Sequence, residues 1–234
     1  MFRTVLMAGL CLAMGVAPGF AQETRQESIM VTASMIEENA AAIPAISRKV
    51  RADFVSVEVS YHSATRDVAQ RRAELETMFA RLKEAVAKTP GVFLSGGELG
   101  YATAPIDTVL FSDVLNTYGE AWSFSLILGV DTRPDETFDQ LMERADAFVK
   151  GIPAMGRSEA WLGDEQALGA RDIDSHRLAL LQDISAETSR LQAIFSASEL
   201  HVGGLESGVV MIPTGPLELQ LYVPYTLKIM QSPG

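Results

Sequence analysis

The chain has 234 residues, of which 47% are hydrophobic and 21% charged, a composition typical of one soluble globular domain or of two small ones sharing a core. Its 30 acidic and 19 basic residues give a formal charge of −11 at pH 7. Nucleic acids and anionic membrane surfaces attract clustered Lys and Arg, so this charge argues against both as partners. Collagen-like and disordered compositions are excluded as well.

The first 21 residues have the parts of a secretory signal peptide. Arg3 gives a positive start, a short apolar core follows, and Gly19 and Ala21 place small residues at the −3 and −1 positions of a cleavage site. The apolar core is shorter than the roughly 20 residues that a transmembrane helix needs. We therefore expect cleavage after Ala21, no transmembrane anchor, and a periplasmic mature chain over 22–234.

The single cysteine, Cys11, lies inside this signal, so the mature chain contains no cysteine. Leu10 stands where a lipoprotein signal has a small residue, and we expect no lipid anchor. Disulfides, Cys-ligated zinc and thiol nucleophiles are excluded together. Removal of the signal leaves 30 acidic against 18 basic residues, a formal charge of −12.

The first elements of the mature chain are expected to be strands followed by a helix. Residues 29–34 alternate and predict a short strand, while 35–46 have no clean period and predict a loop. Alternation from Val55 to Tyr61 predicts a strand with one polar face. A single apolar stripe then predicts a helix that is capped by Thr65 and ends at Pro90.

The middle of the chain repeats this order. A short apolar run at 92–94 precedes a glycine-rich turn, and 98–118 predict a strand plus an irregular connection. Alternation over 122–130 predicts a second strong strand. The helix expected next starts at Pro134 and stops at Gly151.

The last third predicts a long helix and a long strand. A short strand over 156–162 is followed by a helix that begins at Glu165 or Asp172 and ends at Phe195. A short strand over 200–205 comes next.

Seven consecutive odd positions from Leu217 to Ile229 are apolar and predict one final strand. Pro224 lies on its other face, which predicts an edge or a bulge there. The elements together predict an α+β fold, with an antiparallel or mixed sheet and three amphipathic helices packed on one face. Two halves that meet near residue 120 are compatible with this order.

The order of elements resembles the SIMPL-domain family of bacterial envelope proteins. The resemblance rests on Ala52-Asp53 leading into the strand 55–61, the helix opening Ala64–Val68, the turn at Gly96-Gly97, and the later elements through the final strand. Ala52 stands where the family usually has Pro. The resemblance implies an α+β fold, periplasmic or outer-membrane association, self-assembly, and a link to envelope or oxidative stress. The family has no established catalytic residues to carry over.

The best metal-like spacing is Asp172-x-Asp174-x-His176, where Asp172 and His176 would share one helical face. The same residues also serve as the acidic first turn of a helix. This is a weak candidate, and no metal or other cofactor is expected.

Other patterns that suggest chemistry are incomplete. His62 and His201 have no Ser or carboxylate at a local spacing that suggests a triad, although a triad can still assemble in space. In Gly204–Gly208, Glu206 stands where a serine nucleophile would lie. Ser95–Gly100 is glycine-rich but lacks the lysine of a phosphate loop.

Two functions remain open at this point. The first is a non-enzymatic, self-associating periplasmic envelope protein, expected to be a homo-oligomer with a peripheral envelope association. The second is a periplasmic small-ligand binder or hydrolase that uses a cleft between two halves. In that case His201 or the pair Asp172 and His176 would lie near the cleft.

Overall fold

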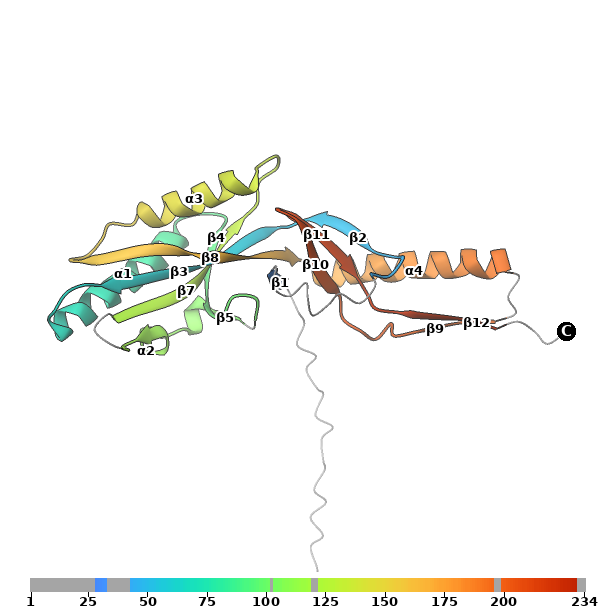
Figure 1. Ribbon diagram of the computed structural model, residues 1–234, viewed down its shortest axis with the longest axis horizontal. Coiled ribbons are helices and arrows are strands. Elements are labelled where there is room, and N and C mark those ends of the chain that lie inside the picture. The colour runs from blue at the N-terminus through green and yellow to red at the C-terminus, as the bar shows by residue number, and fades with distance from the viewer. Residues whose placement is uncertain (1–27, 33–42, 102, 119–121, 196–198, 231–234) are drawn as a thin grey trace, which may run out of the picture.

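The computed structural model describes residues 28–32, 43–101, 103–118, 122–195 and 199–230. They form two lobes joined end to end (Figure 1). The first lobe contains a large sheet with α1 to α3, and the second contains two small sheets with α4. Every strand pairing among the described residues is antiparallel, so the predicted α+β class is confirmed. The predicted signal peptide and residues 35–42 of the predicted loop lie outside the described residues.

The large sheet has seven strands within the described residues, in the order β1, β8, β3, β7, β4, β5, and β6 pairs with β7. Their bounds are β1 (Ser28–Thr32), β3 (Phe54–Ser63), β4 (Val92–Gly97), β5 (Thr103–Pro105), β6 (Leu115–Asn116), β7 (Trp122–Asp131) and β8 (Ser158–Arg171). The two strands predicted most clearly, β3 and β7, pair along their whole length at the centre of this sheet. The strongest alternation in the sequence therefore marks the middle of the fold.

One face of the large sheet is covered by α1 (Val68–Ala87) and α3 (Phe138–Lys150). Both helices contribute to the same hydrophobic core as the alternating residues of β3. The fully buried members from these three elements are Val55, Val57, Val59, Tyr61, Leu75, Met78, Leu82, Leu141 and Ala145. Burial of such aliphatic and aromatic side chains is the main force that holds helices on a sheet.

The helix starts differ from the predicted ones. Asp67 caps α1, because its carboxylate accepts the backbone N–H of Gln70 at 2.8 Å, so the prediction of Thr65 as cap was wrong. The start predicted at Pro134 was also wrong. Thr137 caps α3, since the left-handed backbone of Asp135 (φ 59°) interrupts any earlier helical turn.

The segment after β4 is irregular, as the weak pattern over 98–118 predicts. It contains a short 3-10 turn, η2 (Ile106–Thr108), and one helical turn, α2 (Phe111–Val114). The ring of Phe111 packs against Phe79 of α1 at 5.6 Å and Phe124 of β7 at 6.0 Å between ring centres. This aromatic cluster closes the core beneath α1.

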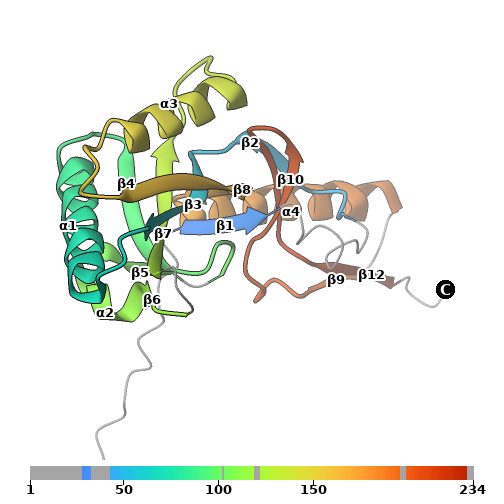
Figure 2. The ribbon, with the colours of Figure 1, turned by 60° about the vertical axis from the view of Figure 1, so that its left-hand side comes forward.

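The second lobe is built around α4 (Ile173–Phe195). Its buried residues Leu180 and Ile184 join the core of a three-stranded sheet in the order β10 (Val210–Gly215), β11 (Glu218–Tyr222) and β2 (Arg48–Arg51). A separate two-stranded ribbon of β9 (Glu199–Gly203) and β12 (Thr226–Met230) runs alongside α4 (Figure 2).

Two predictions about the last third of the chain were wrong. Of the two starts predicted for the long helix, Glu165 was wrong, because residues 165–171 belong to β8, which pairs with β3 on one side and β1 on the other. The start predicted at Asp172 was right, since α4 begins at Ile173. The single strand predicted over 217–229 is two strands, β11 and β12, in different sheets. The break falls around Pro224, which has no N–H to give to a ladder.

The boundaries between the two lobes do not lie near residue 120. The chain crosses from the second lobe to the first at Ala52, and back again at Asp172. Trp122 instead begins β7, in the middle of the large sheet. The large sheet is thus assembled from 28–32 and 54–171, and the small one from both flanks of that segment.

Candidate functional site

The crossing at Ala52 ties the two lobes together through the backbone. The N–H of Ala52 donates to the carbonyl of Leu217 in the second lobe at 2.9 Å. One residue later, the N–H of Asp53 donates to the carbonyl of Gly169 in β8 at 2.8 Å, and its carbonyl accepts from the N–H of Thr132 at 2.9 Å. The crossing segment is therefore bonded to both sheets at once.

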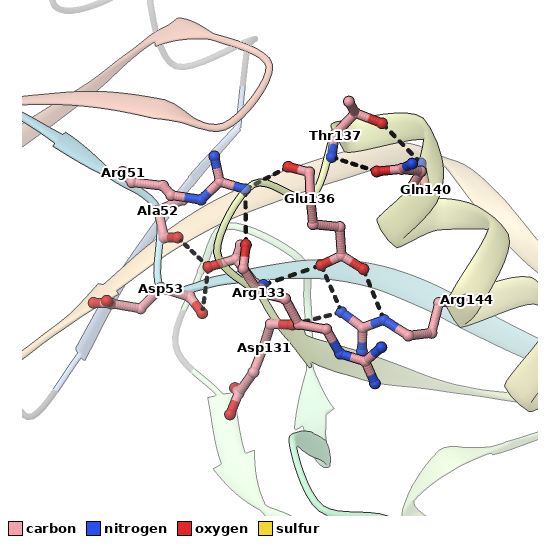
Figure 3. Close-up of polar contacts among 10 residues, drawn as sticks. Arg51, Ala52, Asp53, Asp131, Arg133, Glu136, Thr137, Gln140 and Arg144 are labelled. Carbon is pink, nitrogen blue, oxygen red and sulfur yellow. Dashed lines mark hydrogen bonds and ion pairs between the residues drawn. The ribbon is translucent and has the colours of Figure 1, made fainter.

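An ion pair next to this crossing fixes the connection between β7 and α3. Arg144 binds Glu136 with two parallel hydrogen bonds, from Nε at 2.9 Å and from Nη2 at 2.8 Å, and its Nη2 also reaches the carbonyl of Asp131 at 2.7 Å (Figure 3). The Glu136 side chain is only 9% exposed, and the N–H of Arg133 adds a further donor at 3.0 Å. The Arg144 hydrogen bonds lower the pKa of Glu136, so the carboxylate stays charged.

Arg51 links this connection to the second lobe. It lies at the end of β2, and its Nη2 donates to the carbonyls of Arg133, at 3.2 Å, and of Glu136 (Figure 3). An exposed guanidinium of one lobe is in this way held in a fixed orientation by the other lobe.

An open groove lies beside Arg51, between the two lobes. It has a volume of about 510 Å³ and is lined by Arg51, Asp135, Glu136, Thr137, Phe138, Asp139, Pro216 and Leu217. A second hollow of about 340 Å³ is lined by Lys49, Val50, Arg51, Leu217 and Glu218. The two hollows share the lining residues Arg51 and Leu217, and we call them together the interlobe groove. This groove lies between the two lobes described above, not between halves that meet near residue 120.

The far end of the second lobe is a second candidate surface. The apolar face that α4 buries with Leu180 and Ile184 continues with Leu191, Ile194 and Phe195, yet Ile194 is 59% exposed and Phe195 is 51% exposed. The ribbon beside them exposes Ile229 and Met230 as well. We call the last three turns of α4 together with β9 and β12 the arm. α4 extends beyond the three-stranded sheet that covers its first half (Figure 1), so the apolar face continues past its cover.

A third feature is a buried carboxylate at the start of α1. Glu74 is 2% exposed and accepts hydrogen bonds from the hydroxyls of Ser63, at 2.6 Å, and Thr65, at 2.8 Å, and from Gln70 at 3.3 Å. The backbone N–H of Arg157 adds a longer bond at 3.4 Å. Burial alone raises the pKa of this carboxyl, but the hydrogen bonds together outweigh burial and lower it. Its donors come from three different segments, so Glu74 serves to join them.

The weak metal candidates Asp172, Asp174 and His176 are not brought together with further ligands among the described residues. Asp172 precedes α4 with a left-handed backbone (φ 52°), and its carbonyl, not its carboxylate, accepts the N–H groups of Ser175 and His176. Asp174 lies in the first turn of α4, the place of an acidic residue that complements the helix dipole. Within the described part of the chain, no three His, Cys, Asp or Glu side chains lie together in a way that could hold a metal ion.

The other two histidines are also apart from the interlobe groove. His201 lies on β9 with its Nε2 at 3.2 Å from Glu199, and His62 lies on β3 with its Nε2 at 3.7 Å from Glu159. Neither belongs to the residues that line the groove. The alternative in which His201 or Asp172 and His176 serve the cleft therefore has no support in this arrangement.

Comparisons with protein-family models, with curated proteins and with solved structures give no match. Among the residues that the structure describes, no helix is long and apolar enough to cross a membrane.

Proposed function

We propose that this chain is a non-enzymatic, self-associating protein of the bacterial envelope, similar in kind to SIMPL-domain proteins, and that its copies associate through the arm. The observation that carries the proposal is the apolar face of α4. Leu180 and Ile184 are buried on it, whereas Ile194 and Phe195, on the same face, are more than half exposed. Continuous apolar surface of this kind marks protein–protein contacts.

The ribbon of the arm supports a second copy as the partner. β9 and β12 pair only with each other among the described residues, so each has one edge that no other described strand covers. A lone two-stranded ribbon is marginal in water, and extension by further strands would stabilise it. In the ribbon, Lys228 lies opposite His201 and diagonal to Glu199, which is two residues before His201.

Charge favours a head-to-tail order of the copies. If β12 of one copy pairs with β9 of the next in the register of the ribbon itself, Lys228 lies diagonal to the neighbouring copy's Glu199. Pairing of two β12 strands about Lys228 would instead set like charges side by side. A head-to-tail contact closes into a ring or extends as a filament.

Light scattering after size exclusion, on residues 22–234 at tens of micromolar, tests this proposal. We expect a mass of several chains for the wild type and of one chain for Ile194→Glu. Leu178→Glu is the matched control, because Leu178 is also 59% exposed on α4 but lies away from the arm. A wild-type chain that is strictly monomeric, or equal effects of the two substitutions, contradicts the proposal.

The envelope location is proposed from the signal peptide and from the resemblance. It predicts that the protein isolated from bacterial periplasm starts at Gln22, as N-terminal sequencing would report. The absence of cysteine from the mature sequence makes any role in oxidative stress independent of thiol chemistry. An intact N-terminus in the cytoplasmic fraction contradicts this location.

A further inference from the structure

We propose that the interlobe groove binds a short peptide in zwitterionic form, with its carboxylate against Arg51 and its ammonium group against Asp135 and Asp139. This is a binding activity beyond self-association, and it uses a surface separate from the arm. The two hollows of the groove, about 510 and 340 Å³, fall in the size range of small-molecule sites.

The floor of the groove is apolar and its walls are charged. Leu217 lies at its centre, shared by both hollows, and is 8% exposed. Phe138, the first residue of α3, and Pro216, in the turn before β11, add further apolar lining to the larger hollow. Apolar floors with a few convergent polar groups are typical of ligand sites, since the floor supplies affinity and the polar groups fix orientation.

The wall formed by β2 is cationic and pre-oriented. A guanidinium has five N–H donors, and the two carbonyls of the opposite lobe occupy Nη2 of Arg51. Both bidentate edges of a guanidinium include Nη2, so Arg51 keeps Nη1, whose N–H groups can each donate singly to a carboxylate oxygen. Because the orientation is fixed before binding, little entropy is lost when a carboxylate arrives.

The opposite wall, at the start of α3, is anionic. Glu136 is committed to Arg144, whereas Asp135 and Asp139 are exposed and take part in none of the ion pairs described. The Glu136–Arg144 pair holds the loop that carries Asp135. An anionic ligand would meet these two carboxylates and a cationic one would meet Arg51, so the charge pattern selects a ligand with both groups.

A titration with tri-alanine, followed by backbone amide shifts in NMR spectra of residues 22–234, tests the proposal. We expect shifts at Arg51, Thr137 and Leu217 and a dissociation constant on the order of 1 mM, as an exposed groove allows. N-acetyl-tri-alanine and tri-alanine amide each lack one charge, and we expect each to bind roughly three- to tenfold more weakly.

Asp135→Asn is the decisive variant, because Asn tolerates a left-handed backbone and keeps the shape of Asp. This variant should bind tri-alanine roughly three- to tenfold more weakly than the wild type and bind N-acetyl-tri-alanine with unchanged affinity. Asp172→Asn is the matched control, since Asp172 is the other described non-glycine residue with positive φ and lies outside the groove.

Equal affinities for the three tri-alanine forms, or equal effects of the two Asp variants, overturn the proposal, as does an absence of shifts in the groove. The monomeric variant Ile194→Glu should bind tri-alanine like the wild type. A failure of peptide binding in the groove can thereby be told apart from a failure of self-association through the arm.

Discussion

The carboxylate of Glu74 lies where a side chain of residue 156 would be. A Cβ atom added to Gly156 would come within 2.1 Å of Oε1 of Glu74, and the backbone of Gly156 has a φ of +60°. Both the close approach and the left-handed backbone require glycine at this position. The loop before β8 can therefore dock on α1 only because residue 156 has no side chain.

Gly156→Ala should lower the free energy of unfolding by about 2–4 kcal/mol, from backbone strain together with the clash. Urea denaturation followed by circular dichroism measures this change. Gly208→Ala is the control, since no atom lies within 4 Å of a Cβ added there. Equal free energies of unfolding for the two variants would show that the loop before β8 can move to accommodate a side chain at residue 156 without loss of stability.

Glu74→Gln should be destabilising at pH 7 and less so in acid. The hydrogen bonds keep the pKa of Glu74 below its ordinary value, so the unfolded chain takes up the proton first as the pH falls. The contribution of Glu74 is thus complete above the range in which an unfolded Glu titrates, about pH 4, and is lost below it.

We expect a loss of roughly 1–3 kcal/mol at pH 7 for Glu74→Gln, from weakened bonds to Ser63 and Thr65. Unfolding curves at pH 7 and at a pH below 4 measure the difference between variant and wild type. Glu76→Gln, an exposed site on the same helix, should show no such difference. If the difference in free energy of unfolding between Glu74→Gln and wild type does not shrink in acid, the buried carboxylate of Glu74 is not the source of that stability.

Glu136 and Arg144 should show coupled effects on stability. Each single substitution, Glu136→Gln or Arg144→Met, should cost roughly 1–3 kcal/mol, because each leaves a largely buried polar partner unsatisfied. A double-mutant cycle in urea should give a coupling energy of about 1–2 kcal/mol. Lys150→Met removes an exposed pair with Asp146 on the same helix and should change stability by less than about 0.5 kcal/mol.

Gly129→Ala should destabilise the large sheet. A Cβ at residue 129 would lie 2.0 Å from Cζ of Phe93, whose ring lies across the backbone of β7. Overpacking of this kind costs about 1–3 kcal/mol, because the Phe93 ring must shift and lose its edge contact with Phe54. Thermal unfolding measures the loss, and Gly163→Ala, with its nearest contact at 3.4 Å, should show little change.

The sequence predicted the elements with strict periodicity and missed those without it. β3, β7, α1 and α3 were located from alternation or from apolar stripes, because one face of each is apolar. The prediction that the other face of β3 is wet was wrong, since Ser56 and Ser60 on that face are buried. β2 and β10 were missed: three of the four residues of β2 are exposed, so no alternation exists to detect.

The long alternation over 217–229 was misleading for the opposite reason. The apolar positions of β11 are buried, whereas those of β12 are partly buried or exposed, and the break between the two strands keeps the phase of the pattern. A period of two reports alternation of side chains, not continuity of a strand, and Pro224 was the one local sign of the break.

The candidate site could not be predicted, since it joins residues distant in sequence. Arg51 meets Glu136 across 85 positions, and no spacing rule links them. Glu74 did leave a trace: the stripe of α1 has a gap of seven between Val68 and Leu75, and Arg71 and Glu74 are buried there instead of apolar residues. A polar residue within an apolar stripe is a sign of a buried hydrogen-bond network.

The pairing of β2 with β11 also governs the order in which the chain can fold. Val50 lies opposite Leu219, so the second lobe cannot close until nearly the whole chain is present. The first lobe likewise waits for β8, which supplies the partner of both β1 and β3. Contacts so distant in sequence make folding slow, and a chain that folds late stays extended for longer after synthesis. The export proposed above would gain from this delay, because translocation of this kind requires an unfolded polypeptide.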